Sequence, residues 1–212
     1  GNETMLTRRI GSLDVSVVGI GCNNFGWTLF THSLDAAATT RVAHAAMDAG
    51  INFFDTAESY GDSETLLGMA LQGRRDRAVI ATKFSKAQPA DIRVALEGSL
   101  RRLKTDRIDL YQLHRPDPAV PVEDTLGVLD EFVREGKVRE IGCSNVSAHQ
   151  LCAAEEAHGA GARFVSVQNE LSLLNRAAGK DVVPECERLG IAFLPFFPLA
   201  NGSILRLTTA VW

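Results

Sequence analysis

Short apolar segments alternate with longer amphipathic segments along this chain, at intervals of roughly thirty residues. Parallel strands need a long crossover connection, usually a helix, so this alternation predicts consecutive β-α-β units. We expect seven strands, at residues 17–21, 51–54, 78–82, 108–113, 138–143, 164–167 and 191–196. A doubly wound sheet would carry a G-x-G-x-x-G turn after its first strand, and Gly19-Ile20-Gly21 lacks the third glycine. The pattern therefore favours an α/β fold of the (β/α)8 TIM-barrel class.

Both ends of the chain depart from this repeat. Residues 5–10 and 14–18 flank Gly11-Ser12, which predicts an N-terminal β-hairpin. After the seventh strand, Ser203 begins an apolar stretch over 203–212 that predicts the helix before an eighth strand. We therefore expect one barrel domain over 1–212 with an incomplete C-terminal strand–helix unit.

Two explanations of this incomplete end stay open. Either further residues belong to the protein, or the barrel is truncated at seven strands. A truncated barrel has two unpaired sheet edges, which a second chain could cover in a homo-oligomer.

Turn and capping residues predict where the helices begin and end. We expect helices over about 35–48 and from about 62 to 71, with Gly50 and Gly73 behind them. Further helices are expected from Asp91, acting as the N-cap, and from Pro121 to Gly136. Ser147 and Gln150 predict a capping box, and a last short helix is expected over 180–189.

Polar side chains follow the expected strands at their carboxyl ends. Asp55, Lys83 and His114 end three of them, and Tyr60 lies five residues beyond Asp55. Each residue has a structural explanation on its own: a helix-capping acid, a half-buried loop phenol, a solvated lysine, a core histidine. A barrel, however, gathers the carboxyl ends of its strands into one ring, where its catalytic groups lie. Convergence at one barrel mouth favours a catalytic site.

Composition excludes several classes of function. A net charge of −4 and a pI near 5.8 argue against nucleic acid or an anionic membrane as the main partner. The cysteines at 22, 143, 152 and 186 form no C-x-x-C pair and no zinc spacing, which predicts no metal and a reducing compartment. The start of the chain lacks an apolar signal core, and the longest apolar run, 191–200, is too short to span a bilayer. We expect a soluble cytoplasmic protein.

Several motifs in sequence order resemble the aldo-keto reductase family. They are Asp55-Thr56-Ala57-Glu58-Ser59-Tyr60-Gly61, Ala81-Thr82-Lys83, Asp109-Leu110-Tyr111-Gln112-Leu113-His114, Gly136 to Asn145, Val167-Gln168-Asn169-Glu170 and Phe196-Phe197-Pro198-Leu199. The resemblance runs from about residue 5 to 202. It implies a barrel reductase that transfers hydride from NADPH to the carbonyl of a small aldehyde or ketone. The family's adenosine-binding segment has no counterpart here.

The resemblance also implies roles for individual residues. Tyr60 would be the general acid, and Lys83 would lower the pKa of its phenol. Asp55 would keep Lys83 charged, and His114 would orient the substrate by a hydrogen bond to the carbonyl oxygen. The implied cofactor-binding residues are Gly21, Cys22, Asp55, Ser144, Asn145, Gln168, Phe196 and Leu199. Phe196 stands where the family usually has a tyrosine that stacks on nicotinamide, and stacking needs only the aromatic face.

Two further questions stay open at this point. Phe25, Trp27 and Phe30, on the loop after the first strand, could line a substrate pocket or simply pack the loop. The histidines at 44, 149 and 158 lie in expected helices and are expected to be solvated, and His32 lies in a polar loop. As an alternative to catalysis, the chain could be a non-catalytic cofactor binder or scaffold on the same fold.

Overall fold

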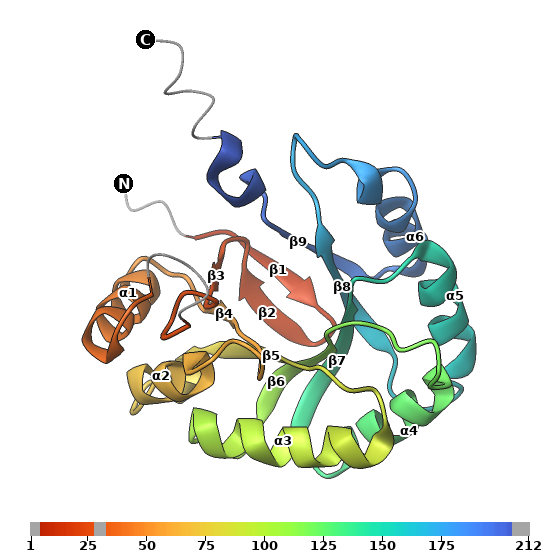
Figure 1. Cartoon of the computed structure of the whole chain (residues 1–212), viewed down its shortest axis with the longest axis horizontal. Helices are drawn as coiled ribbons and strands as arrows, with labels where there is room; N and C mark the ends of the chain where they lie inside the picture. The colour runs from red at the N-terminus through yellow and green to blue at the C-terminus, as the bar shows by residue number, and fades with distance from the viewer. Residues whose placement is uncertain (1–4, 28–32, 205–212) are drawn as a thin grey trace.

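A computed structural model describes residues 5–27 and 33–204 of the chain. Seven parallel strands form one curled sheet in the order β3-β4-β5-β6-β7-β8-β9, so consecutive strands are neighbours (Figure 1). The strands are β3 (Gly19–Gly21), β4 (Phe53–Asp55), β5 (Val79–Phe84), β6 (Ile108–Leu113), β7 (Val138–Ser144), β8 (Phe164–Glu170) and β9 (Ala192–Phe196). The predicted barrel class is confirmed, with seven of its strands among the described residues; β3 and β9 are the edges of this sheet.

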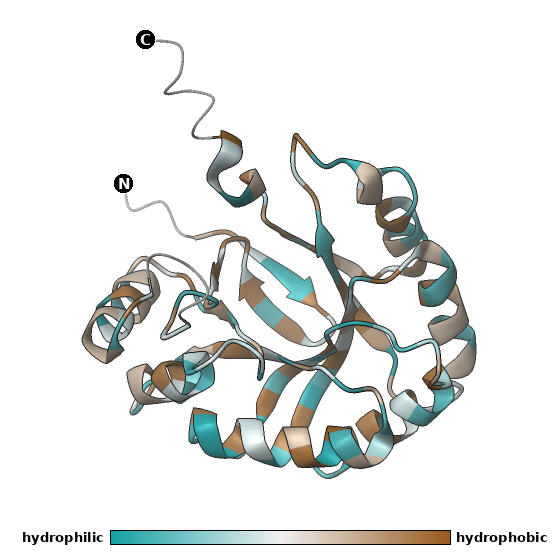
Figure 2. Ribbon diagram, in the orientation of Figure 1, coloured by the Kyte–Doolittle hydropathy of each residue, from teal (hydrophilic) through white to brown (hydrophobic). Residues whose placement is uncertain are grey.

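Helices cover the convex face of the sheet (Figure 1). They are α1 (Ala36–Asp48), α2 (Ser63–Ala70), α3 (Pro89–Leu103), α4 (Val122–Arg134), α5 (Ala148–Ala157) and α6 (Val182–Leu189), with short 3₁₀ helices η1 (Arg75–Arg77), η2 (Ala177–Gly179) and η3 (Ala200–Gly202). Figure 2 shows hydrophilic and hydrophobic residues on the same helices, as expected of amphipathic helices. In α4, for example, Leu126, Leu129 and Phe132 face the sheet and are almost fully buried.

The predicted N-terminal hairpin fills the concave side of the sheet. It consists of the antiparallel strands β1 (Thr7–Ile10) and β2 (Leu13–Ser16). Their apolar residues form a cluster with strand residues of the interior: Ile10, Leu13, Val15, Phe53, Val79, Ala81 and Leu110. The Ser12 amide donates to Glu140 Oε1 at 2.8 Å, and the Ser16 amide donates to Asn52 Oδ1 at 2.8 Å. The hairpin thus closes the amino-terminal end of the barrel, and polar side chains occupy the other end.

Several element boundaries differ from the sequence-based expectations. The helix expected from Asp91 begins at Pro89 with Gln88 as its N-cap, because proline suits the first helical position. Four strands, β4, β5, β7 and β8, extend one to three residues further than predicted, so Asp55, Lys83, Ser144 and Gln168 lie within strands instead of after them. The capping box of Ser147 and Gln150 is confirmed. The helix expected over 203–212 lies mostly outside the described residues.

Close packing of α2 against α3 gives a prediction about stability. A methyl group added at Gly68 would lie 2.7 Å from the carbonyl oxygens of Arg102 and Leu103. Because these atoms belong to the backbone, they cannot rotate away as a side chain could. Gly68→Ala is therefore expected to lower the free energy of unfolding by about 1–3 kcal/mol, measured by urea denaturation.

Gly127 in α4 provides the matched control, since a methyl group there meets nothing within 4 Å. Gly127→Ala should raise the free energy of unfolding by up to about 1 kcal/mol through helix propensity alone. Equal effects of the two substitutions would contradict the close approach of α2 and α3.

Candidate active site

A buried lysine–carboxylate pair lies at the carboxyl end of the barrel. Lys83 on β5 is 1% exposed, and its Nζ donates to both carboxylate oxygens of Asp55 at 2.8 Å and to the Thr56 carbonyl at 2.9 Å. Burial opposes the charge of the ammonium, but the charge and hydrogen bonds of Asp55 outweigh it and raise the pKa of Lys83. Lys83 is therefore a fixed positive charge at neutral pH.

Tyr60 lies on the loop between β4 and α2, with three groups around its ring. Trp27 stacks on it at a centroid distance of 5.1 Å, and the His114 ring meets it edge-on at 5.9 Å. The Lys83 Nζ lies 5.3 Å from the centroid of the Tyr60 ring. The fold thus brings Asp55, Tyr60, Lys83 and His114 into one cluster, as their positions at strand ends predicted.

The pKa of Tyr60 differs from the sequence-based expectation. Burial raises the pKa of the phenol, whereas the charge of Lys83 lowers it, and burial prevails. Lys83 acts on the phenol in the expected direction, but the larger effect of burial leaves the net pKa of Tyr60 above its usual value. The phenol is consequently neutral and carries its proton at neutral pH.

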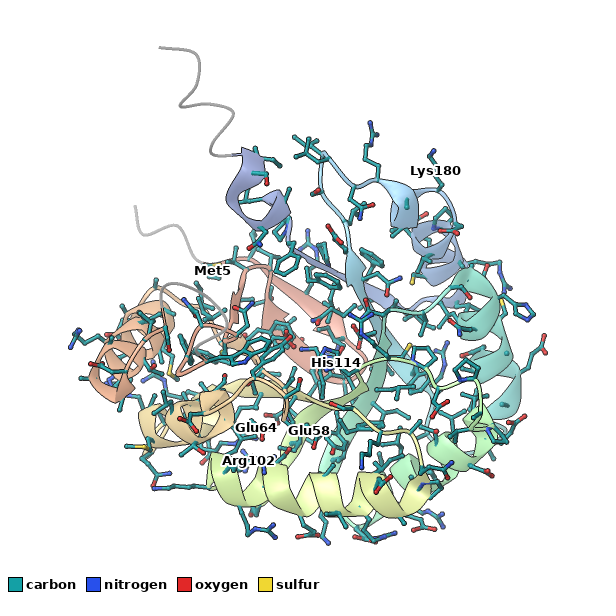
Figure 3. The ribbon with its side chains drawn as sticks, in the orientation of Figure 1. Met5, Glu58, Glu64, Arg102, His114 and Lys180 are labelled. Carbon is teal, nitrogen blue, oxygen red and sulfur yellow. The ribbon has the colours of Figure 1, made fainter. Side chains whose placement is uncertain are left out.

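His114 directly follows β6 and lies over the middle of the curled sheet (Figure 3). Its amide donates to the Phe84 carbonyl at 3.0 Å, and its carbonyl accepts from Asn145 Nδ2 at 3.0 Å. Burial, reinforced by the nearby charges of Lys83 and Arg115, lowers the pKa of His114 to about 4. The imidazole is neutral at neutral pH and offers one N–H donor.

This lowered pKa makes the stability of the protein depend on pH. Between the ordinary value of 6.5 and about 4, His114 is protonated in the unfolded chain but not in the folded one. The unfolded state then binds more protons, so stability should fall as pH falls through this window. In His114→Gln the decline of the unfolding free energy should be shallower, measured by urea denaturation across the window. The exposed His149→Gln is the control; an equal change there would contradict the assignment.

Further buried groups hold the loop that carries Tyr60. Ser63 Oγ donates to the Cys22 carbonyl at 2.6 Å and lies 2.8 Å from Thr56 Oγ1, joining the loops after β3 and β4. Glu58 Oε1 accepts from the Ser85 amide at 2.7 Å. A positioning role for Ser63 was not predicted, because a serine at a helix start is usually explained as a cap.

A second polar contact to Asp55 comes from inside the barrel. Gln112 on β6 is fully buried; its Nε2 donates to Asp55 Oδ1 at 3.4 Å, and its Oε1 accepts from Ser166 Oγ at 3.4 Å. A side chain at Gly142 would collide with Ser166 Oγ, so only glycine leaves room for the hydrogen bond between Ser166 and Gln112. Gln112 was not among the predicted site residues, although its position two residues before His114 places it on the same side of the strand.

The ends of β7 and β8 meet beside this cluster. Ser144 and Gln168 are register partners, and Ser144 Oγ donates to the Gln168 carbonyl at 2.6 Å. The backbone amide of Asn145 donates to the same carbonyl at 3.1 Å. Asn145 has a left-handed backbone conformation, with φ of 57°. In the described part of the chain, the Gln168 side-chain amide and Asn145 Oδ1 have no hydrogen-bond partner. Both remain available to a ligand.

The other four predicted cofactor residues lie in differing surroundings. Gly21 ends β3 with open space where a side chain would be. Cys22 is fully buried in the core between sheet and helices, burial raises the pKa of its thiol, and its backbone amide and carbonyl are already hydrogen-bonded within the chain. Phe196 ends β9 half-buried, with its ring edge-on to Phe197 at 5.2 Å. Leu199 is 49% exposed.

The remaining aromatic and histidine candidates differ in their surroundings. Phe25 is a core residue at 1% exposure, whereas Trp27 belongs to the cluster through its stack on Tyr60. His44 is half-buried and bonds to the Ala70 carbonyl at 2.8 Å, so it is not simply solvated. Phe30 and His32 lie outside the described residues.

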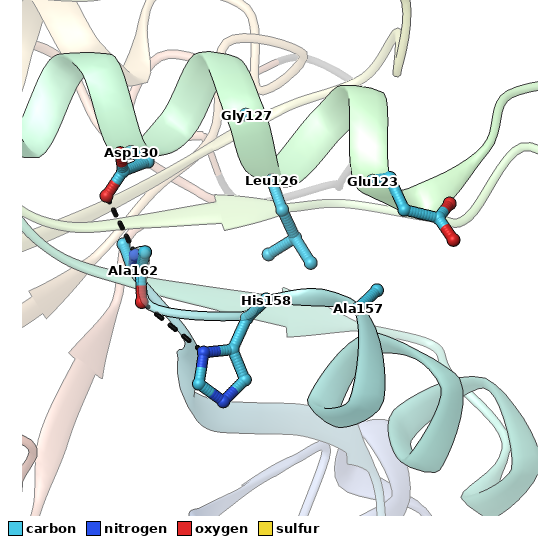
Figure 4. Close-up of a pocket in the computed structure, with 8 residues that line it drawn as sticks. Glu123, Leu126, Gly127, Asp130, Ala157, His158 and Ala162 are labelled. Atoms are coloured by element: carbon cyan, nitrogen blue, oxygen red, sulfur yellow. Dashed lines mark hydrogen bonds between the residues drawn. The ribbon is translucent and has the colours of Figure 1, made fainter.

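Two cavities on the described surface lie away from this cluster. One, of about 240 Å³, lies between α4 and α5 (Figure 4). Two of its polar side chains already have partners: Asp130 accepts from the Ala162 amide, and His158 bonds to the Gly161 carbonyl. The other, of about 190 Å³, is mostly apolar and lies behind the β6–α4 loop. Within the described ranges, no His, Cys, Asp and Glu residues group as metal ligands, and no helix is long and apolar enough to cross a membrane.

Comparison with known proteins gives one consistent result. The model of the Aldo/keto reductase family matches residues 17–209. An aldo-keto reductase from Klebsiella pneumoniae in complex with NADPH shares 30% identity with a TM-score of 0.84, covering 96% of this chain and 72% of that one. The holo form of an aldo-keto reductase from Bacillus halodurans shares 30% identity with a TM-score of 0.83, covering 93% and 68%. An aldo/keto reductase from Klebsiella pneumoniae in complex with NADP and acetate shares 30% identity with a TM-score of 0.79, covering 90% of this chain and 67% of that one.

Proposed function

The chain belongs to the aldo/keto reductase family, and on that premise we propose that it reduces the carbonyl group of small aldehydes or ketones with NADPH. One observation carries the proposal: a neutral phenol, a charged ammonium and a neutral imidazole converge at the barrel mouth. The Lys83 Nζ is 5.3 Å and the His114 ring 5.9 Å from the centre of the Tyr60 ring.

The free groups beside this cluster fit a nicotinamide cofactor. A carboxamide has one acceptor and two donor hydrogens, and the unpartnered Gln168 amide and Asn145 Oδ1 complement it. Phe196, half-buried at the end of β9, has an aromatic ring suited to stacking. Gly21 leaves open space beside the same barrel end. Bound NADPH would supply the hydride that reduces the carbonyl carbon.

The residues of the chain supply the proton and the orientation. Tyr60 holds a proton at neutral pH and transfers it to the carbonyl oxygen, becoming phenolate as the alcohol forms. Lys83, kept charged by Asp55, stabilises that developing negative charge. Neutral His114 donates a hydrogen bond to the same oxygen and orients the carbonyl. Trp27, stacked on Tyr60, shields the phenol from water.

Steady-state assay of NADPH oxidation with a panel of aromatic and aliphatic aldehydes and ketones tests the proposal. We expect turnover of several neutral carbonyl compounds with NADPH. Cofactor binding without turnover of any compound in the panel would instead support a non-catalytic cofactor binder on the same fold.

A further inference from the structure

A cation next to His114 is not used by the chemistry described so far. Arg115 is exposed on the β6–α4 loop, and among the described residues its side chain has no hydrogen bond and no ion pair. In the described part of the chain, other exposed arginines also lack a carboxylate partner, Arg41 and Arg101 among them, but neither of these directly follows a residue of the cluster. An unpaired guanidinium beside a substrate-orienting residue therefore calls for an explanation.

The backbone fixes the position of Arg115 at the mouth. His114 is held on both sides, by its amide bond to Phe84 and by the bond from Asn145 to its carbonyl. Pro116 follows Arg115 and restricts its backbone. Asp117, the nearest acid along the chain, accepts from the Ala119 amide at 2.9 Å and forms no ion pair with Arg115. The guanidinium is thus tethered next to His114 and is not paired with that acid.

The charges that act on His114 leave Arg115 uncompensated. They come from Lys83, Arg115 and Asp55. Both oxygens of Asp55 are bound to Lys83 at 2.8 Å, so that pair is internally neutralised. Glu58, the other acid near the Tyr60 loop, uses Oε1 for the Ser85 amide. Arg115 is therefore the cation beside His114 that has no paired carboxylate among the described residues.

We propose that Arg115 determines substrate specificity by binding an anionic group, a carboxylate or a phosphate, carried by the carbonyl substrate. The inference rests on the proposed function, because His114 fixes where the carbonyl lies. A planar guanidinium matches carboxylate and phosphate oxygens with two parallel hydrogen bonds, and it stays charged at every working pH. The substrate class is therefore aldehydes or ketones whose far end is anionic.

A matched pair of substrates tests this directly. Para-formylbenzoate and its methyl ester share the aldehyde and the ring but differ in charge. The wild-type chain should prefer the anion in kcat/KM by about tenfold or more, the range of a charge-assisted hydrogen bond. In Arg115→Leu this preference should disappear through a higher KM for the anion, with kcat and the ester's constants nearly unchanged. Arg115→Lys should retain part of it, and added salt should weaken it in the wild type.

Arg101→Leu is the control, since Arg101 is exposed on α3 and its loss changes the net charge equally. It should leave the preference intact. The same assays with a phosphate-bearing aldehyde show which of the two anions Arg115 binds. Arg115→Leu should lower kcat/KM more for that anion than for the other. Equal kcat/KM for anion and ester in the wild type, or an unchanged preference in Arg115→Leu, would overturn this inference while leaving the reductase itself in place. Turnover of neither compound, nor of the panel above, would instead refute the proposed function.

Discussion

Carbonyl reduction by Tyr60→Phe is expected to fall by about 10²–10⁴-fold, the contribution of a positioned general acid. The substitution removes only the hydroxyl, so the ring keeps its stack on Trp27 and its contact with His114. NADPH affinity should stay nearly unchanged, because the groups that fit the carboxamide come from β7 and β8. Steady-state turnover and a cofactor titration by fluorescence measure the two effects separately.

Tyr111→Phe is the matched control for this variant. Tyr111 is the second tyrosine of the two in the chain; it is fully buried on β6, and its hydroxyl has no hydrogen-bond partner among the described residues. Removing it should leave activity and stability close to wild type or slightly improved. A double-digit percentage of wild-type turnover in Tyr60→Phe would remove Tyr60 from the mechanism.

Lys83→Met should have a large effect on both activity and stability. Turnover should fall by several orders of magnitude, since no charge then stabilises the developing phenolate. Asp55 would be left without its partner in a mostly buried site, which costs about 3–5 kcal/mol of unfolding free energy.

Because the pKa of Lys83 is raised, the stability from its charge is present below its unfolded pKa near 10.5 and lost as pH rises through the folded value.

A double variant separates the two roles of Lys83. Lys83→Met with Asp55→Leu removes the orphaned carboxylate, so urea denaturation should show recovered stability while turnover stays low. Lys86→Met, an exposed lysine on the loop after β5, should change neither quantity. Recovery of turnover together with stability would mean that Lys83 only holds the barrel mouth together.

The sequence predicted which residues come together at the site more reliably than it predicted the pKa of Tyr60. Strand periodicity and the thirty-residue repeat indicate a barrel, and a barrel brings Asp55, Lys83 and His114 together whatever its details. The net pKa shift of Tyr60 could not be predicted, because it depends on how deeply Trp27 and neighbouring loops bury the phenol. Local sequence likewise does not reveal that the Cys22 side chain is buried in the core between the sheet and the helices.

Two other differences have separate causes, one local and one long-range. The start of α3 moved from Asp91 to Pro89, since two residues compatible with a helix start lie within one turn. Gln112 was missed because an amide inside an apolar strand gives no charge signal, and its contact to Asp55 exists only after β4 and β6 are both in the sheet.

Transfer of deuterium from labelled NADPH to product tests the central claim most directly. The wild-type chain is incubated with para-nitrobenzaldehyde and NADPH that carries deuterium on one or the other face of the reactive nicotinamide carbon. The alcohol is then analysed by mass spectrometry. Our account predicts deuterium on the carbinol carbon from one face only, with almost no product from Tyr60→Phe. NADPH that binds but transfers no deuterium from either face would contradict it.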